Sequence, residues 1–274
     1  MAGHIPVIHP DDPAIAEFRM IREKDLVGRQ NKFIVEGAVV LSMLAVAHAK
    51  GGAFRAEKLL ILDRKLPAIA SILDQFPGDI PVYVADAAVL DSIVGFHLHR
   101  GILALGQKVE SLSQATAGKV QTGGSLVLAG FGLSNHDNLG ALFRNAAAFG
   151  VNHVFLDATS CDPLYRKALR VSVGSVLTVP WSYGGDASAI LRMLADQGYE
   201  IWGLSPQGEI DIRAIRPSSR VALIVGTEGE GLSRAILSAI RTARIPQVPG
   251  LDSLNVGTAT GIALFHMASA MTRL

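Results

Sequence analysis

The sequence VALIVGTEGEGLS, residues 221–233, joins an apolar run to a glycine-rich turn. The run is apolar throughout rather than alternating, which is typical of a strand buried on both faces of a parallel sheet. The turn contains Gly226, Gly229 and Gly231, whose backbone N–H groups can approach a ligand closely. This stretch therefore predicts a parallel α/β sheet with a ligand site at the carboxyl end of one strand.

The chemistry of this turn narrows the choice of ligand. No Gly-Lys-Ser/Thr follows, so the turn is not a P-loop, and its glycines lack the spacing of a dinucleotide fingerprint. The carboxylates of Glu228 and Glu230 disfavour a phosphate and favour a neutral or cationic part of a ligand. A tight turn with acids on the surface explains this segment equally well when the segment is taken alone.

A second segment, NHDNLGALFRNAAAFG at residues 135–150, begins a helix. Its first residues offer several N-caps, and Arg144 follows Asn138 by six residues, close to two helical turns. We expect both side chains to face the same crevice. The alternative is an asparagine that caps the helix and an arginine that lies in solvent.

A third segment, RIPQVPGLDSLNVGTATGIALFH at residues 244–266, leads into the last helix. Pro246 and Pro249 interrupt regular structure before Ser253 and Asn255, whose polar groups can bind loop backbone or substrate. Helix capping and close helix packing are the alternative explanation for this segment.

Apolar runs at regular intervals organise the chain. Residues 1–107 predict a small α/β domain, residues 108–124 a polar linker, and residues 125–274 a doubly wound parallel α/β domain. The expected strands are FIVEG (33–37), KLLIL (58–62), VYVAD (82–86), GILALG (101–106), SLVLAGF (125–131), HVFLD (153–157), SVLTVP (175–180), EIWGLS (200–205), VALIVG (221–226) and ARIPQV (243–248).

The three polar segments lie at or just beyond the ends of such strands. The carboxyl ends of parallel strands meet at one edge of a sheet, which is where α/β folds bind ligands. We therefore expect residues 138–144, 226–231 and 253–255 to form one site.

Composition excludes several classes of protein. The 274 residues are 49% hydrophobic and 18% charged, against a usual ~45–50% and ~25%, which indicates extensive buried surface. A net charge of +1 provides no global field for polyanions, so any RNA surface has to be a local patch. The single Cys161 excludes an intrachain disulfide and a paired-cysteine metal site. The longest apolar stretch, from Val39, is too short to span a bilayer, and we expect a soluble, cytoplasmic protein without metal or membrane partner.

Taken together and in order, the three segments resemble motifs 1, 2 and 3 of the SpoU-type (TrmH-like) RNA ribose 2′-O-methyltransferases of the SPOUT superfamily. The first half resembles the family's small ribosomal-protein-like RNA-binding domain, through FIVEG at Phe33 and FHLHRGILALG at Phe96. The residues that match the motifs are Asn138, Gly140, Arg144, Ala146, Gly226, Glu228, Gly229, Gly231, Ile245, Pro246, Ser253, Leu254, Asn255 and Val256.

The resemblance implies a fold, a cofactor and an assembly. The fold is an α/β domain with a C-terminal trefoil knot and a mostly parallel sheet, the cofactor is S-adenosylmethionine, and the assembly is a homodimer that forms through the knot region. Backbone of motifs 2 and 3 then binds the cofactor. The implied cofactor-binding residues are Leu204, Gly226, Thr227, Gly229, Gly231, Ile245, Leu254 and Asn255.

The resemblance also implies the chemistry, a methyl transfer to a ribose 2′-hydroxyl. Arg144 matches the family's catalytic arginine, but arginine stays protonated in proteins and is a poor general base. We expect its guanidinium to anchor the neighbouring phosphate or to stabilise the developing alkoxide. The predicted catalytic residues are Arg144, Asn138, Glu228, Ser253 and Asn255.

The chain departs from the family pattern at a few positions. Asn145 stands where Thr or Ser is more frequent, Gln247 where Met is common, and Gly257-Thr258 replace a more usual Ser-Val pair. None of these changes removes a predicted catalytic group. We expect them to alter the shape of the pocket or the packing of the knot.

Local clusters of basic residues are candidates for RNA contact, although solvated helix faces usually explain such runs. Two histidines in an expected loop can stack on or bind RNA. The predicted RNA-binding residues are Arg19, Arg22, Arg29, Lys32, His99, Arg100, Arg166, Lys167 and Arg170.

Two other classes of function remain open. A non-catalytic RNA-binding or ribosome-assembly protein on the same fold would be expected to lack Arg144 or Asn255, and both are present. A dinucleotide-dependent oxidoreductase needs GxGxxG after its first strand, which SLVLAGFGLSN, from Ser125, does not supply. Within the methyltransferases, the two-domain layout favours rRNA over tRNA as the substrate.

Overall fold

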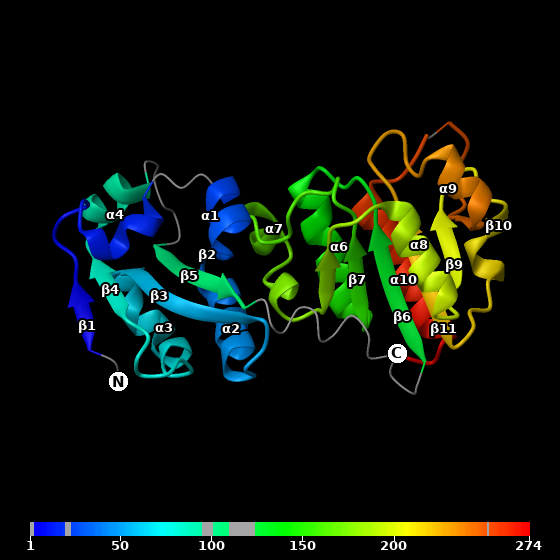
Figure 1. Ribbon diagram of the computed structural model, residues 1–274. Helices are drawn as coiled ribbons and strands as arrows, with labels where there is room; N and C mark the ends of the chain where they lie inside the picture. The colour runs from blue at the N-terminus through cyan, green and yellow to red at the C-terminus, as the bar shows by residue number, and fades with distance from the viewer. Residues whose placement is uncertain (1–2, 20–22, 95–100, 110–123, 251) are drawn as a thin grey trace. The chain divides into compact units, whose positions relative to one another are not determined.

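The computed structural model describes residues 3–19, 23–94, 101–109, 124–250 and 252–274 (Figure 1). It divides into two compact units, Met1–Gln114 with Leu164–Thr178 and Ala115–Pro163 with Val179–Leu274. The segment Leu164–Thr178 therefore belongs with the first unit, although the sequence places it inside the predicted domain of residues 125–274. Most of the predicted linker, residues 110–123, lies outside the described residues.

The first unit is built on a mixed sheet whose described strands have the order β1-β4-β3-β5-β2. Strands β1 and β3 run parallel to β4, whereas β5 runs antiparallel to its neighbours β3 and β2. Its strands are β1 (His4–Pro6), β2 (Lys32–Glu36), β3 (Phe54–Leu62), β4 (Val82–Ala85) and β5 (Ile102–Lys108). Its helices are η1 (Pro13–Phe18), α1 (Glu23–Gln30), α2 (Ala38–Ala49), η2 (Asp63–Lys65), α3 (Leu66–Leu73), α4 (Ala87–Val94), α7 (Arg166–Val171) and η3 (Ser175–Leu177).

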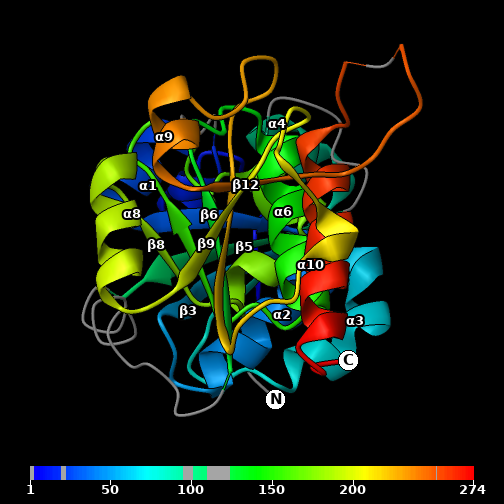
Figure 2. The same cartoon turned by 90° about the vertical axis from the view of Figure 1, so that its right-hand side faces the viewer.

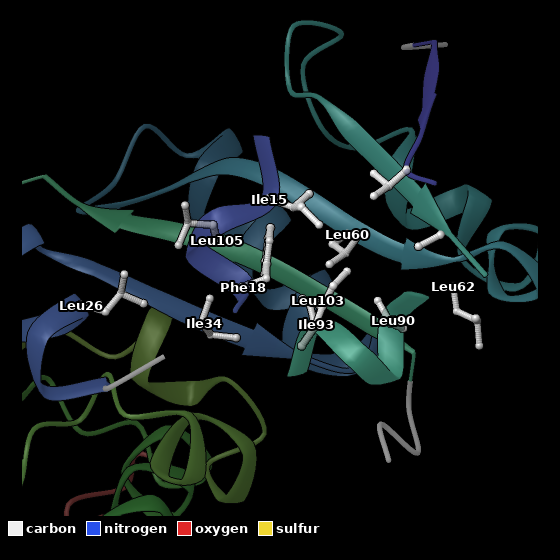
Figure 3. Close-up of a cluster of buried hydrophobic side chains, with 12 residues drawn as sticks. Ile15, Phe18, Leu26, Ile34, Leu60, Leu62, Leu90, Ile93, Leu103 and Leu105 are labelled. Atoms are coloured by element: carbon white, nitrogen blue, oxygen red, sulfur yellow. The ribbon is translucent and has the colours of Figure 1, made fainter. Parts of the chain in front are cut away.

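One buried cluster holds part of this unit together (Figure 3). Ile15 and Phe18 of η1 lie in the same cluster as Leu60 of β3 and Leu103 of β5. The Asp12 carboxylate accepts the backbone N–H of Ala14 at 2.9 Å, which caps the start of η1. Pro13 follows this cap in the first turn of η1, which is a short 3₁₀ helix.

The second unit is built on a seven-stranded sheet with the order β10-β12-β9-β11-β6-β7-β8. Every neighbouring pair of these strands is parallel. The parallel sheet predicted from the apolar runs is therefore confirmed. The strands are β6 (Ser125–Gly130), β7 (His153–Leu156), β8 (Trp181–Tyr183), β9 (Glu200–Leu204), β10 (Ile210–Asp211), β11 (Arg220–Val225) and β12 (Arg241–Arg244).

Helices cover both faces of this sheet, which explains why its strands are apolar throughout. Figure 2 shows α8 (Ala187–Asp196) and α9 (Arg234–Ala239) on one side, and α6 (His136–Ala148) and α10 (Val256–Ala270) on the other. Side chains such as Ile224 of β11 pack in one buried cluster with residues of α8. In the part of the chain that the structure describes, no helix is long and apolar enough to cross a membrane.

Two of the expected strands are corrected. Residues 175–180 were expected to form a strand, but Ser175–Leu177 form the 3₁₀ helix η3, and the strand follows at β8. A short apolar run fits a buried helix as well as a strand, so periodicity alone does not separate the two. The strand expected at 243–248 ends at Arg244, just before Pro246, which has no N–H to donate to a sheet.

Because the sheet is parallel, the carboxyl ends of β6, β9, β11 and β12 lie at one edge. The chain leaves these strands after Gly130, Leu204, Val225 and Arg244. The three segments predicted to form a site all follow strands of this set. The fold thus brings residues that are far apart in the sequence to the same edge.

Candidate active site

The centre of the candidate site is the Glu228 carboxylate, which lies among asparagine side chains from two other segments. Asn138 Nδ2 donates to Glu228 Oε1, and Asn255 Nδ2 lies 3.3 Å from the same oxygen. Asn255 Nδ2 also donates to Asn138 Oδ1 at 2.8 Å. Asn135 Nδ2 lies 3.5 Å from Glu228 Oε2, the other oxygen of the carboxylate. Members of all three predicted segments therefore meet, and we call the set of Asn138, Glu228 and Asn255 the amide–carboxylate triad.

Local structure positions each member of the triad. The Asn255 side chain caps α10, since its Oδ1 accepts the N–H groups of Gly257 at 2.9 Å and Thr258 at 3.2 Å. Its amide nitrogen remains available for Asn138 and Glu228. Capping and site formation were alternative explanations for Asn255, and a single side chain does both. Asn138 lies in the first turn of α6 and is 5% exposed.

The turn after β11 presents Glu228 to this network. Gly231 N–H donates to the Thr227 carbonyl at 3.2 Å and closes a tight loop. At Gly226 the chain passes so near the backbone of Gly231 that a Cβ atom would overlap it. Only glycine fits at that position, so Glu228 is held exposed at the tip of a fixed turn.

A cavity of about 670 Å³ lies beside the triad. Its walls come from the segments that follow β9, β11 and β12, and its volume falls within the usual range for a small-molecule site. The lining includes all the predicted cofactor-binding residues: Leu204, Gly226, Thr227, Gly229, Gly231, Ile245, Leu254 and Asn255.

The lining combines two kinds of chemistry. Leu204, Ile245 and Leu254 offer apolar surface, while the carboxylates of Glu228 and Asp252 offer negative charge. Such a cavity suits a ligand with a flat apolar part and a cationic centre. S-adenosylmethionine has both, with its adenine ring and its sulfonium, so the residues present fit this cofactor.

The segment after β9 contributes lining residues that we did not predict from the sequence. Ser205, Pro206 and Gln207 line the cavity in a turn closed by Gly208 N–H donating to the Ser205 carbonyl at 3.0 Å. An apolar strand followed by Ser-Pro-Gln-Gly is the same strand-to-turn signal that marks the other segments. Further lining residues without such a signal are Leu232, Leu237, Gln247 and Asp252.

The other two predicted catalytic residues lie apart from the triad. Ser253 is exposed and lines the cavity. Arg144 is exposed on α6 and is not among the described residues that line the cavity. Six residues advance a helix by about 600°, so Arg144 and Asn138 point roughly 120° apart on α6, and the expectation that both face one crevice stays a prediction.

The predicted RNA-binding residues that the structure describes all belong to the first unit. Several already have partners there: Arg19 binds Asp11 at 2.8 Å and Lys32 binds Glu57 at 2.8 Å. The other described ones are Arg29, which is paired with Asp25, Arg170, which is paired with Glu36, and Arg166 and Lys167 of α7. Arg22, His99 and Arg100 lie outside the described residues.

Metal-ligating clusters and the thiol of Cys161 are further candidates for reactive groups in the described part of the chain. Among the residues that the structure describes, no group of three or more His, Cys, Asp and Glu side chains could hold a metal ion. Burial raises the pKa of the Cys161 thiol to about 11, which keeps it protonated at neutral pH.

Residues 125–265 match the model of the SpoU rRNA methylase family. The chain belongs to this family. An uncharacterized tRNA/rRNA methyltransferase of Mycobacterium bovis is 36% identical over 271 residues, which cover 95% of this chain and 90% of the relative. The predicted family is confirmed, and RNA methylation as the class of activity follows from membership.

Solved structures share the fold. An AdoMet-bound rRNA methyltransferase from Sinorhizobium meliloti superposes with a TM-score of 0.79 at 22% identity, covering 99% of this chain and 98% of that chain. A structure described as an RNA 2′-O ribose methyltransferase gives a TM-score of 0.76 at 24% identity, covering 99% of this chain and 100% of its own. These likenesses confirm the SPOUT α/β fold, while the trefoil knot stays a prediction.

Proposed function

We propose that this SpoU-family protein transfers a methyl group from S-adenosylmethionine to a ribose 2′-hydroxyl of a structured RNA. The observation that carries the proposal is the meeting of Asn138, Glu228 and Asn255 beside the cavity. The network joins the segment that begins α6 to two segments of the cavity wall. A substrate held by the triad would thus lie next to the bound cofactor.

The bound cofactor supplies a methyl group that its sulfonium has already activated. The protein then has to hold the hydroxyl in line and help it lose its proton. We propose that Leu204, Ile245 and Leu254 contact the adenine and that the cavity carboxylates favour the cationic part of the ligand.

The triad is suited to hold a ribose. The Glu228 Oε1 atom is engaged by Asn138 and Asn255, whereas the partner of Oε2 among the described residues is the Asn135 amide at 3.5 Å. An exposed carboxylate oxygen and two ordered amides provide acceptors and donors for ribose hydroxyl groups. Ser253, exposed on the cavity wall, adds a hydroxyl of its own.

Arg144 has a different role in this proposal. Its guanidinium is exposed, and no hydrogen bond or ion pair engages it among the described residues. Arginine is a strong ligand for phosphate oxygens because it donates in a planar fork. We assign the Arg144 guanidinium to bind the phosphate next to the methylated ribose or to stabilise the developing alkoxide. The ribose 2′-hydroxyl then loses its proton to phosphate or water.

Ribosomal RNA is the substrate that we favour over tRNA. Support comes from the two-part chain and from the likeness to a protein described as an rRNA methyltransferase, which covers 99% of this chain. We assign RNA binding to the small α/β domain of residues 1–107 and to the basic residues of α7, and catalysis to residues 125–274. Exposed Ile262 and Phe265 on α10 support the proposed homodimer through the predicted knot region, and RNA methylation supports a cytoplasmic location.

A comparison of cellular RNA tests the function. Sites of 2′-O-methylation are mapped in total RNA from cells with and without this protein. We expect one or a few sites in rRNA to disappear, to return fully when the intact gene is restored, and to return to a much lower extent with an Asn255→Ala variant. Loss of a base methylation, or an unchanged 2′-O-methylation map, would overturn the proposal, and a lost site in tRNA would overturn only the choice of RNA.

A further inference from the structure

Asn145 lies on the same face of α6 as Asn138, because seven residues advance a helix by about 700°, close to two full turns. The Asn145 amide nitrogen donates to the backbone carbonyl of Gly257 at 2.7 Å. Gly257 is in the first turn of α10, two residues beyond Asn255. The face of α6 that supplies Asn138 to the triad therefore contacts α10 at a second point.

The peptide groups of Gly257 are held from two sides. Its N–H donates to Asn255 Oδ1 at 2.9 Å, and its carbonyl accepts from Asn145 at 2.7 Å. Asn255 in turn donates to Asn138 Oδ1 at 2.8 Å. A continuous path of hydrogen bonds thus runs from Asn145 through Gly257 and Asn255 to the triad.

The packing of the two helices makes room for this side chain. A Cβ atom at Gly261 would lie 3.1 Å from Asn145 Nδ2, and one at Gly257 would lie 2.8 Å from the Ala141 Cβ. The absence of side chains at both positions lets α10 approach α6 closely enough for the Asn145 amide to reach a backbone carbonyl. Asn145 and Gly257, both departures from the usual family pattern, therefore act as one structural unit.

We propose that Asn145 is a positioning residue, which fixes the first turn of α10 and thereby holds Asn255 in the amide–carboxylate triad. This inference rests on the proposed function, since it assigns to Asn145 the alignment of the residues that hold the ribose. The neighbouring Arg144 lies on the same helix, so the contact also fixes that helix relative to the segment that carries Ser253 and Asn255.

Hydrogen exchange tests the physical part of the proposal without any substrate. Gly257 and Thr258 donate to Asn255 Oδ1, so their amide exchange reports how firmly Asn255 caps α10. We expect Asn145→Ala to speed exchange at both amides roughly fivefold, the change that corresponds to losing one hydrogen bond. Tyr199→Phe is the matched control, because it removes the 2.8 Å contact with Ser125 Oγ at the amino end of the sheet. Unchanged exchange at Gly257 and Thr258 in Asn145→Ala would overturn the proposal.

A double-mutant cycle tests the functional part. In purified protein that methylates RNA, we expect Asn145→Ala to lower kcat roughly tenfold with little change in the KM for RNA, as misplacement of a reacting group does. In an Asn255→Ala background the same change should have almost no further effect, because the residue through which it acts is gone. Effects on kcat that multiply in the double variant would overturn the positioning role. If Asn145→Ala does not fold, Asn145→Ser, which removes fewer atoms, carries the same cycle.

The two tests separate this inference from the function that it rests on. A wild-type protein without 2′-O-methyltransferase activity contradicts the proposed function, and the exchange experiment still decides whether Asn145 holds the cap. An active wild type with independent effects at the two positions contradicts only the role of Asn145. Tyr199→Phe should leave kcat unchanged in either background.

Discussion

The two ends of the parallel sheet use similar side chains in opposite ways. At the amino end, Glu200 accepts from Arg241 at 2.7 Å and from the Ser218 N–H at 2.8 Å, and the Arg241 guanidinium lies 4.0 Å from the centre of the Trp202 ring. At the carboxyl end, Glu228 lies with two asparagines beside a cavity, and its side chain is exposed. Ionised groups alone therefore do not mark a site; polar groups that converge next to open volume do.

The largest effect on activity is expected at Arg144, and Arg241 at the amino end of the sheet is its control. Arg144→Ala should lower kcat by roughly 10² to 10³, the cost of removing a charged group that stabilises a transition state. Arg241→Ala should leave kcat unchanged and lower only the stability of the protein. The measurement is single-turnover methyl transfer alongside thermal unfolding. Full activity of Arg144→Lys would argue against a role for the guanidinium fork.

The next largest effect on activity is expected at Glu228, which we compare with Glu200. Glu228→Ala should lower kcat by about 10²-fold, because the triad loses the acceptor that orients both amides. Glu200→Ala, its counterpart at the amino end, should cost about 1 kcal/mol of stability and no activity. Equal losses of activity in the two variants, after correction for the folded fraction, would remove the distinction between the two ends.

Alanine substitutions of a glycine at each end of the sheet, Gly226 and Gly124, should differ in their effect on cofactor binding. Gly226→Ala places a Cβ atom against the backbone of Gly231 and should distort the turn that lines the cavity. We expect the Kd for S-adenosylhomocysteine to rise about tenfold, which corresponds to ~1.4 kcal/mol. In Gly124→Ala, at the amino end of β6, the nearest backbone atom is the Ser219 oxygen at 3.3 Å, and affinity should be unchanged. Calorimetry that finds the same Kd for Gly226→Ala and wild type would contradict the assignment of this cavity.

Much of the second unit was predictable because its signals are local. Strands buried on both faces read as apolar runs, and the glycine turn after β11 follows directly from its sequence. The fold class, the family and the convergence of Asn138, Glu228 and Asn255 were all expected. Whether each of these side chains acts in catalysis stays a prediction.

Other features depend on packing between distant parts of the chain, which no local pattern records. The run at 175–180 fits a buried helix as well as a strand, and periodicity does not specify that Ser175–Leu177 form η3 and that the strand β8 begins only at Trp181. The grouping of Leu164–Thr178 with the first unit comes from contacts such as that of α7 with β2. The contact of Asn145 with Gly257 joins residues 112 positions apart, so the sequence showed only an unusual asparagine.

The smallest effect on activity is expected at a histidine that is buried for structural reasons. His153 begins β7, its ring stacks near Phe155, and its Nε2 lies 2.8 Å from Ser182 Oγ. Burial lowers the pKa of His153 to about 4, below the 6.5 of an ordinary histidine. Between pH 4 and pH 6.5 the unfolded chain therefore binds more protons at His153 than the folded chain does. The stability that the buried neutral imidazole contributes is present above pH 6.5 and is lost as the pH falls towards 4.

The lowered pKa of His153 corresponds to a loss of at most about 3 kcal/mol of unfolding free energy as the pH falls from 6.5 to 4. In His153→Gln, the fall in unfolding free energy between pH 7 and pH 4.5 should be smaller than in wild type, while kcat at pH 7.5 changes little after correction for the folded fraction. Identical pH dependence in the two proteins would show that His153 is not the group that titrates.

Transfer of a labelled methyl group to RNA by the purified protein tests the central claim most directly. RNA from cells that lack the protein is incubated with S-adenosylmethionine labelled in its methyl group, hydrolysed with alkali and separated. We expect the label in alkali-resistant dinucleotides, because a methylated 2′-oxygen cannot attack the neighbouring phosphate, and we expect much slower labelling with Asn255→Ala or Glu228→Ala. Label in single nucleotides, which places the methyl group on a base, or equal labelling by Glu228→Ala, would contradict the account.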